Sequence, residues 1–170
     1  MSALPNLVKQ ANLIVDGQGY LGKLENAKLP DLKQKVEEWR GGGMLGDIEV
    51  TVGFEKMAMP FKLGGIEPGL FKLWGLQNNA VKAFQVLGHA VAEDTGETMS
   101  IDAYIRGKLA DVETDEFKPG SQGMSSYEVK IHYYRLRVND EELIEYDPIN
   151  LVLKIGGVDQ LASMRANLGL

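Results

Sequence analysis

Apolar and polar residues alternate along several segments of the chain, and this period of two is typical of β-strands with one buried face. The pattern runs through residues 48–54 and continues through residues 57–63, where Pro60 indicates an edge strand or a bulge. It is clearest in residues 98–109. One predicted face of that strand carries Met99, Ile101, Ala103, Ile105 and Leu109, and the opposite face carries Ser100, Asp102, Tyr104, Arg106 and Lys108.

Further strands are predicted on both sides of this segment. Residues 81–92 precede it and are joined to it by a hairpin loop, residues 93–97, in which Gly96 suits a left-handed backbone conformation. In residues 127–138 the apolar face changes phase near the middle, which indicates a bulge or a strand that crosses between two sheets. Short strands are predicted at residues 143–146 and 151–155.

Two segments fit helices better than strands. Pro68 is a favourable first-turn residue for a helix over residues 69–76, whose apolar side chains could cover a sheet. The tail at residues 158–167 has apolar residues at helical spacing and Asp159 in its first turn.

Residues 32–40 fit either element. Leu32, Val36 and Trp39 share one face of a helix, whereas Lys33, Lys35 and Glu37 share one face of a strand. The pattern alone favours a helix in this segment. No linker-like run divides the chain, so residues 1–170 are predicted to form one mainly β domain.

Composition narrows the function classes. The chain has 18 Lys and Arg against 24 Asp and Glu, a net charge of −6, which argues against a free nucleic-acid binder. It has no Cys and two His, which excludes thiol chemistry and disulfides and disfavours a zinc site. No apolar run is long enough to span a bilayer and the amino terminus lacks signal-peptide features, so we expect a soluble domain made inside the cell, with no membrane insertion.

The segment from Gly17 to Gly22 reads G-x-G-x-x-G, the dinucleotide-binding fingerprint. That interpretation requires a helix opening at the third glycine, but Pro30 follows too soon for a crossover helix. A tight antiparallel hairpin that turns on Asp16 and Gly17 is the favoured interpretation.

The sequence signals for a calcium site or a catalytic site are weaker still. Asp111, Glu113 and Asp115 have the first spacings of a calcium loop, but Glu116 stands where that loop needs glycine. His89 and His132 lie within predicted strands, without the serine and carboxylate arrangement of a catalytic triad. We therefore predict no enzyme activity, no catalytic residues, no metal and no cofactor.

The most unusual stretch is residues 40–47, which contain four glycines between charged ends. It is interpreted as a flexible hairpin connection whose apolar tip could be a docking element ordered by a partner. The residues concerned are Arg40, Gly41, Gly42, Gly43, Met44 and Leu45.

A series of short strings recurs along the chain in a familiar order, at residues 12–17, 29–30, 38–44, 94–98, 133–136, 145–150, 156–161 and 165–170. Together these strings resemble the major tail tube proteins of contractile-tailed bacteriophages, a group that includes R-type bacteriocin tubes. The likeness covers nearly the whole chain, and its closing segment is specific because such a tail has no general structural reason to recur.

The resemblance implies a two-sheet β-sandwich or barrel subunit with one short helix, whose strands join a ring-wide β-barrel in a hexamer. Rings would stack into a tube, with the loop at residues 40–47 touching the next ring and residues 32–40 forming a barrel strand. The expected partners are a sheath protein outside, the tape-measure protein and passing DNA in the lumen, and baseplate and tail-terminator proteins at the ends. The expected location is the virion tail, assembled in the host cytoplasm.

If the chain is a tube subunit, two sets of its residues have expected roles, one in lining the lumen and one in packing between subunits. If Met99 and Ala103 face the core, pleat alternation places polar residues on the face toward the lumen, and the predicted lining residues are Glu49, Thr51, Ser100 and Asp102. The carboxyl-terminal segment, residues 158–170, is a second candidate for packing between subunits, through Val158, Leu161 and Leu168, although it could equally cap its own sheet. A headless R-type bacteriocin or other contractile injection system, and a small ligand-binding β-barrel or enzyme, remain as alternatives.

Overall fold

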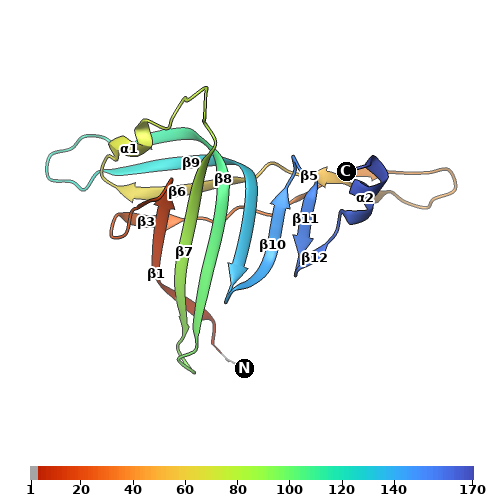
Figure 1. The fold of residues 1–170 in the computed structure, drawn as a ribbon, viewed down its shortest axis with the longest axis horizontal. Coiled ribbons are helices and arrows are strands. Elements are labelled where there is room, and N and C mark those ends of the chain that lie inside the picture. Colours follow the sequence, from red (N-terminus) through yellow and green to blue (C-terminus); the bar gives the residue numbers. More distant parts are fainter. Residues whose placement is uncertain (1–3) are drawn as a thin grey trace.

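A computed structural model describes residues 4–170, and within this part the chain is built mostly of β-strands with two short helices (Figure 1). This confirms the mainly β fold class, with one helix more than the resemblance implied. The elements in chain order are β1 (Asn6–Val15), β2 (Gln18–Gly19), β3 (Leu24–Ala27), β4 (Gln34–Trp39), β5 (Ile48–Phe54), β6 (Ala58–Gly64), α1 (Pro68–Phe71), β7 (Lys82–Ala92), β8 (Thr98–Thr114), β9 (Met124–Val138), β10 (Glu141–Asp147), β11 (Val152–Ile155), β12 (Val158–Asp159) and α2 (Ala162–Leu168).

Ten of these strands form one antiparallel sheet that branches at β9. The main path runs β12-β11-β10-β9-β8-β7-β1-β2, while β6 pairs with β9 and β3 pairs with β6. The first half of β9 pairs with β6 and its last residues pair with β10, so this strand passes from one layer to the other. The sequence left open a bulge or a crossing between two sheets in residues 127–138; the structure keeps β9 within one sheet, and the strand passes between the two layers that this sheet forms. Strands β4 and β5 form a separate two-stranded sheet.

A bulge in the β8–β9 pair explains the change of apolar phase in β9. Arg106 pairs with Tyr133 and the next residue, Gly107, pairs with Ile131, so His132 is the extra residue. An extra residue shifts the alternation by one position. As a result Val129 and Tyr134 both face the core although they are an odd number of positions apart in the sequence.

The hydrophobic core lies between β6 and the β1–β7–β8–β9 layer, and α1 covers one end of it. The aromatic rings of Phe61 and Tyr127 stack with their centroids 5.1 Å apart. Alternation predicted these buried positions on β6 and β8 correctly. Side chains that are completely or almost completely buried include Leu13, Met59, Phe61, Leu63, Leu70, Phe84, Ala103, Ile105, Tyr127, Val129 and Tyr134.

The β1–β2 hairpin turns on Asp16 and Gly17, which both have positive φ angles of 48° and 87°. This pair of left-handed residues is typical of the two-residue turn whose twist matches antiparallel strands. The next element after Gly22 is strand β3 instead of a helix. The hairpin interpretation is confirmed, and the local structure excludes the dinucleotide fingerprint.

The helix favoured by pattern for residues 32–40 is wrong, because residues Gln34–Trp39 form strand β4. All six of its residues are exposed and pair with β5. Pairing between strands outweighs local propensity here, and the apolar residues at helical spacing do not share one buried face. The strand implied by the family resemblance is confirmed.

Both predicted helices are shorter than expected. Helix α1 has Pro68 in its first turn as predicted but extends only to Phe71, and the chain has left the helical conformation by Gly75, which has a positive φ angle. Helix α2 starts at Ala162 because the two residues of β12 pair with β11 instead. It ends on Gly169, whose φ angle of 72° gives a left-handed cap.

Candidate assembly surfaces

The β4–β5 ribbon exposes apolar side chains on a sheet that has no other strand. Trp39 pairs with Ile48 on one face, and their exposed fractions are 62% and 50%. Val50 lies on the same face opposite Glu37 and is also exposed. An isolated two-stranded ribbon is marginally stable in water, and contiguous exposed apolar side chains mark a surface that another molecule covers.

The opposite face of the ribbon is polar and acidic. Glu38 and Glu49 stand directly across from each other, and Val36 stands across from Thr51. The Thr51 hydroxyl donates a hydrogen bond of 3.2 Å to the side-chain carbonyl of Gln34. Like charges directly opposite repel each other, and the ion pair formed at this end of the ribbon, Arg40 with Asp47, involves neither carboxylate.

The loop at residues 40–47 closes the ribbon at the far right of Figure 1. Met44 folds back over the loop, because its sulfur accepts a hydrogen bond of 3.1 Å from the Gly41 amide. The Arg40 guanidinium and the Asp47 carboxylate are 3.8 Å apart across the base of the loop. Leu45 is fully exposed and projects from the tip.

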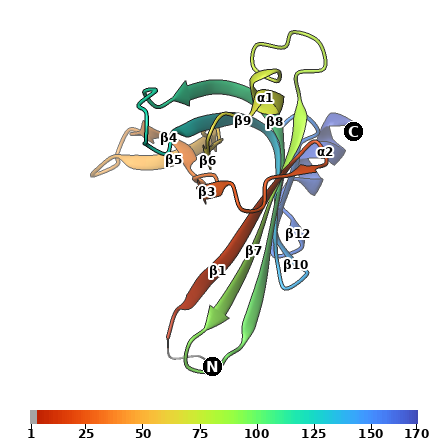
Figure 2. The ribbon, with the colours of Figure 1, turned by 90° about the vertical axis from the view of Figure 1, so that its left-hand side faces the viewer.

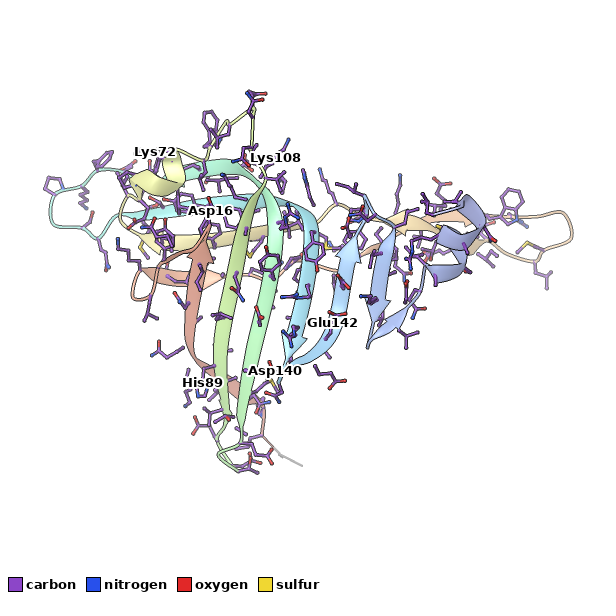
Figure 3. All side chains as sticks on the ribbon, viewed as in Figure 1. Asp16, Lys72, His89, Lys108, Asp140 and Glu142 are labelled. Carbon is purple, nitrogen blue, oxygen red and sulfur yellow. The ribbon has the colours of Figure 1, made fainter. Side chains whose placement is uncertain are left out.

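The outward face of β8 is polar along its length, as the alternation predicted. Asp102 points away from the core and accepts a hydrogen bond of 2.7 Å from the Gln85 side chain on β7. The Ser100 amide donates a hydrogen bond of 2.9 Å to the side chain of Asn139. Figure 3 shows His89 and Asp140 toward the free end of these strands, away from Lys72 beside α1 and from Lys108 at the other end of the strands.

A network of aromatic and charged side chains crosses the same face from β8 to β11. The Arg135 guanidinium lies 5.4 Å from the centre of the Tyr104 ring, and the Tyr133 hydroxyl donates to the Glu145 carboxylate at 2.9 Å. The ammonium of Lys154 donates to the other oxygen of that carboxylate at 2.5 Å. Sequence reasoning missed this network, although alternation places all five residues on one face.

The network perturbs two ionisation equilibria. The hydrogen bond from Lys154 holds the pKa of Glu145 below its usual value, and the bond from Tyr133 acts in the same direction. Burial, together with the neighbouring carboxylate, raises the pKa of Tyr133 to about 12. Both shifts favour the protonation states that this hydrogen-bonded arrangement requires.

The four predicted lining residues lie on two different surfaces. Glu49 and Thr51 belong to the β4–β5 ribbon, whereas Ser100 and Asp102 belong to β8 in the large sheet. Figure 2 shows the ribbon on the same side of β7 and β8 as β6, which is the core side, and Asp102 points away from the core. Within one subunit the structure does not bring the two pairs together.

The carboxyl-terminal segment is attached to its own sheet by polar contacts. Arg165 forms an ion pair with Asp159 and donates a hydrogen bond of 2.7 Å to the Leu151 carbonyl. The bond from Arg165 lowers the pKa of Asp159. Val158 and Leu168 are 63% and 61% exposed, and only Leu161 is partly covered. No residue of α2 is buried, so its apolar side chains do not cap the sheet.

The acidic stretch at the end of β8 has the structure of a solvated strand end. Asp111 and Glu113 are exposed, and Asp115 accepts a hydrogen bond of 3.2 Å from the Met124 amide. Over residues 4–170, no group of His, Asp and Glu side chains is arranged to hold a metal ion. In the same range, no helix has the length and apolar character needed to cross a bilayer.

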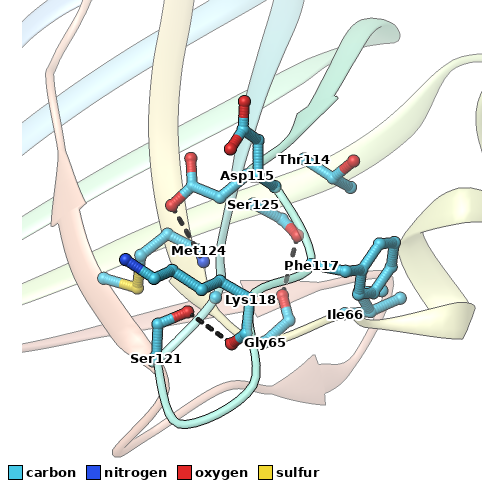
Figure 4. Close-up of a pocket in the computed structure, with 11 residues that line it drawn as sticks. Gly65, Ile66, Thr114, Asp115, Phe117, Lys118, Ser121, Met124 and Ser125 are labelled. Atoms are coloured by element: carbon cyan, nitrogen blue, oxygen red, sulfur yellow. Dashed lines mark hydrogen bonds between the residues drawn. The ribbon is translucent and has the colours of Figure 1, made fainter.

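An apolar pocket of about 220 Å³ lies under the loop at residues 115–123 (Figure 4). Ile66 and Phe117 line one side of it and Met124 lies on the other. Phe117 is 86% exposed, so its ring is not covered by its own chain. Sequence reasoning missed this pocket, because the loop that forms it has no regular pattern of apolar residues.

The model of the phage tail tube protein FII family matches residues 5–169 of this chain. The chain belongs to this family. The tail tube protein of Escherichia phage P2 is 33% identical over 171 residues, which cover 99% of both chains. The major tail tube protein of Serratia phage KSP20 is 29% identical over 158 residues, 91% of this chain and 90% of that protein.

Solved structures of contractile injection systems share the fold of this tail tube protein. The tube-terminating cap of the anti-feeding prophage has a TM-score of 0.60 at 11% identity, with 82% of this chain and 93% of that chain covered. The sheath-tube complex of the injection system PVC, in its extended state, has a TM-score of 0.58 at 13% identity and covers 81% and 93% of the two chains.

These findings confirm the family resemblance. The protein is a tail tube protein of the contractile type and a structural component of the virion tail. A small ligand-binding barrel or an enzyme is correspondingly disfavoured. The subunit has four candidate surfaces for assembly: the exposed ribbon, the Gly-rich loop, the polar face of β8 and the carboxyl-terminal segment.

Proposed function

We propose that six copies of this tail tube protein close into a ring and that rings stack into the conduit through which DNA leaves the particle. The uncovered apolar face of the β4–β5 ribbon carries this proposal. A marginally stable ribbon with exposed Trp39 and Ile48 gains its missing neighbours when strands of adjacent copies close around a bore. Closure also removes the unpaired strand edges that would otherwise promote aggregation.

The subunit itself performs no chemistry and needs no cofactor on this proposal. A contractile sheath surrounds the tube, the tape-measure protein and then DNA occupy the lumen, and baseplate and terminator proteins close the ends. The solved PVC relative is described as part of a sheath-tube complex, which supports a sheath as the outer partner. Assembly takes place in the host cytoplasm, and a headless bacteriocin particle would use the same subunit in the same way.

The polar residues Glu49, Thr51, Ser100 and Asp102 are proposed to face the bore. Their support is pleat alternation, which places Asp102 away from the core, and the Glu38–Glu49 pair on the ribbon. A bore that lets DNA slide must lack the strong phosphate attraction of clustered Lys and Arg. Repetition in a ring multiplies each carboxylate into a band of negative charge.

Negative-stain microscopy of the purified protein tests the main proposal. Wild-type protein is expected to form rings or tubes with a hollow centre, and Trp39→Asp should abolish them while leaving the circular dichroism spectrum unchanged. Leu21→Asp is the matched control, because Leu21 is also exposed but lies outside the ribbon. Compact monomers at every concentration, or calorimetric binding of a nucleotide at residues 17–22, would contradict the proposal.

A further inference from the structure

The Gly-rich loop and the pocket under residues 115–123 lie at opposite ends of the molecule. Figure 1 shows the two loops at the two ends of the longest axis and at similar height, and Figure 2 shows them on the same side of the β7–β8 layer. A second copy displaced along that axis therefore brings its Gly-rich loop toward this pocket. Such a contact joins two different patches and repeats without closing, which is the arrangement that produces an open stack.

The tip and the pocket also match in chemistry. Leu45 is fully exposed, and Met44 is turned back against Gly41, so one apolar side chain projects from the loop. The pocket offers the uncovered surfaces of Ile66 and Phe117 to a side chain of that kind. Its volume of about 220 Å³ leaves room for the side chain together with part of the loop backbone.

The charged residues around the Gly-rich loop and those around the pocket are complementary. Asp115 and Glu116 line the pocket, and Arg40 stands at the base of the loop, where its contact with Asp47 is long at 3.8 Å. Lys118 also lines the pocket, on the side of Met124, and a loop that enters the pocket would bring its Asp47 toward this ammonium group. The charged residues at both ends of the loop, Arg40 and Asp47, therefore have residues of opposite charge at the rim of the pocket.

We propose that Leu45 of one copy inserts into the pocket formed by Ile66, Phe117 and Met124 of a copy in the next ring. The inference rests on the proposed stacking of rings and names the residues that receive the loop. The pocket is held open by a scaffold that does not depend on the occupant. The Ser125 hydroxyl donates to the Gly65 carbonyl at 2.7 Å and the Ser121 hydroxyl to the Lys118 carbonyl at 2.8 Å (Figure 4).

Disulfide cross-linking tests the contact cleanly, because the native chain has no cysteine. A variant with Leu45→Cys and Thr114→Cys, a lining residue outside the hydrogen bonds that hold the pocket open, should give a ladder of covalent multimers on a non-reducing gel when it is assembled under reducing conditions and then oxidised. Either single substitution can give dimers at most. The matched control combines Leu45→Cys with Ser100→Cys on the outward face of β8 and should give no ladder.

The outcomes separate this inference from the proposed function. Tubes without a ladder, or an equal ladder from the control, overturn the docking assignment alone. A wild-type protein that never forms tubes overturns the proposed function and this inference with it.

A charge exchange gives an independent result if the cysteine variants do not assemble. Arg40→Glu and Glu116→Lys should each raise the protein concentration needed for tube growth by about tenfold, and the double variant should restore it. Absence of rescue in the double variant overturns the docking assignment.

Discussion

The carbonyl oxygen of Lys130 lies where a side chain at Gly107 would begin. A Cβ atom at Gly107 would be 2.2 Å from that oxygen and 2.8 Å from a methyl carbon of Val129. The close approach occurs at the β8–β9 bulge that allows β9 to change layers. The glycine is thus required by the space between the strands, since its φ angle is not in the left-handed region.

Gly107→Ala should lower the free energy of unfolding by about 3 kcal/mol, because the contact is with backbone and cannot be relieved by a side-chain rotation. Gly53→Ala is the control, since Gly53 also lies in a strand but a Cβ atom added there would have no neighbour within 4 Å. Chemical denaturation of both variants measures the difference. Equal stability of Gly107→Ala and wild type would show that the strands separate there without cost.

Much of this architecture follows from alternation, which predicted the buried face of β8 and the phase change in β9. The sequence also predicted the turn at Asp16 and Gly17, because few turn types accept two left-handed residues in a hairpin. The sequence pattern was wrong at Val36 and Trp39, where it favoured a helix and the structure has strand β4. An exposed ribbon has no buried face, so its apolar residues carry no period that distinguishes a strand from a helix.

The assembly surfaces were predictable to different degrees. Glycine content identified the loop tip at Leu45, but nothing local marks Phe117 as the wall of a pocket. That pocket depends on the approach of β6 and β9, which are distant in sequence from each other. The expectation of a ring comes from the family resemblance, because no pattern within one subunit encodes it.

Shortening the Gly-rich loop should separate folding from stacking. Replacement of residues 41–46 by Asn-Gly closes the β4–β5 hairpin with a favourable two-residue turn, so the melting temperature should stay within about 2 °C of wild type. Tubes should be replaced by single rings or short stacks in electron micrographs. Gly42→Ala keeps the loop length and has open space around it, so it should form normal tubes. Long tubes from the shortened variant would show that the loop is dispensable.

The carboxyl-terminal segment should contribute to contacts between copies. Leu168→Asp places a charge on a side chain that is 61% exposed, so the free energy of unfolding should change by less than about 0.5 kcal/mol. Assembly, measured by analytical ultracentrifugation, should weaken if Val158, Leu161 and Leu168 form an apolar contact with a neighbour. Asn167→Asp adds the same charge next to it and serves as the control. Unchanged assembly of Leu168→Asp would assign the segment to the free surface.

Stability should fall at both ends of the pH scale, because the hydrogen bond from Lys154 lowers the pKa of Glu145 and burial raises the pKa of Tyr133. The pKa of Glu145 is lowered from 4.5, so its stabilising effect is present above about pH 4.5 and is lost as the pH falls through the lowered value. The pKa of Tyr133 is raised from 10.0 to about 12, so its effect is present below pH 10 and is lost as the pH rises toward 12.

Two variants separate these effects in thermal melts across the pH range. Glu145→Gln should flatten the acid side of the profile, and Tyr133→Phe should flatten the alkaline side. Glu141→Gln, at an exposed position on the same strand, is the control. Profiles that all remain parallel to wild type would mean that other groups govern the pH dependence.

The proposed lining residues can be tested one surface at a time, because the two pairs lie on different sheets. Glu49→Lys reverses one carboxylate of the Glu38–Glu49 pair on the ribbon, and Asp102→Lys reverses the carboxylate that accepts from Gln85. If a residue faces the bore, its substitution creates a ring of positive charge that attracts each passing phosphate. Particles with that change should assemble but eject DNA several-fold more slowly, with a deficit that shrinks as the salt concentration rises.

Neutral variants provide the matched comparison, since Glu49→Gln and Asp102→Asn remove charge without adding a phosphate contact and should eject at nearly the wild-type rate. A surface whose Lys variant ejects DNA normally does not line the bore. Because Asp102 points away from the core while the ribbon lies on the core side, the two surfaces can give different results. A slow Glu49→Lys particle beside a normal Asp102→Lys particle would assign the bore to the ribbon and leave the β8 face for the sheath.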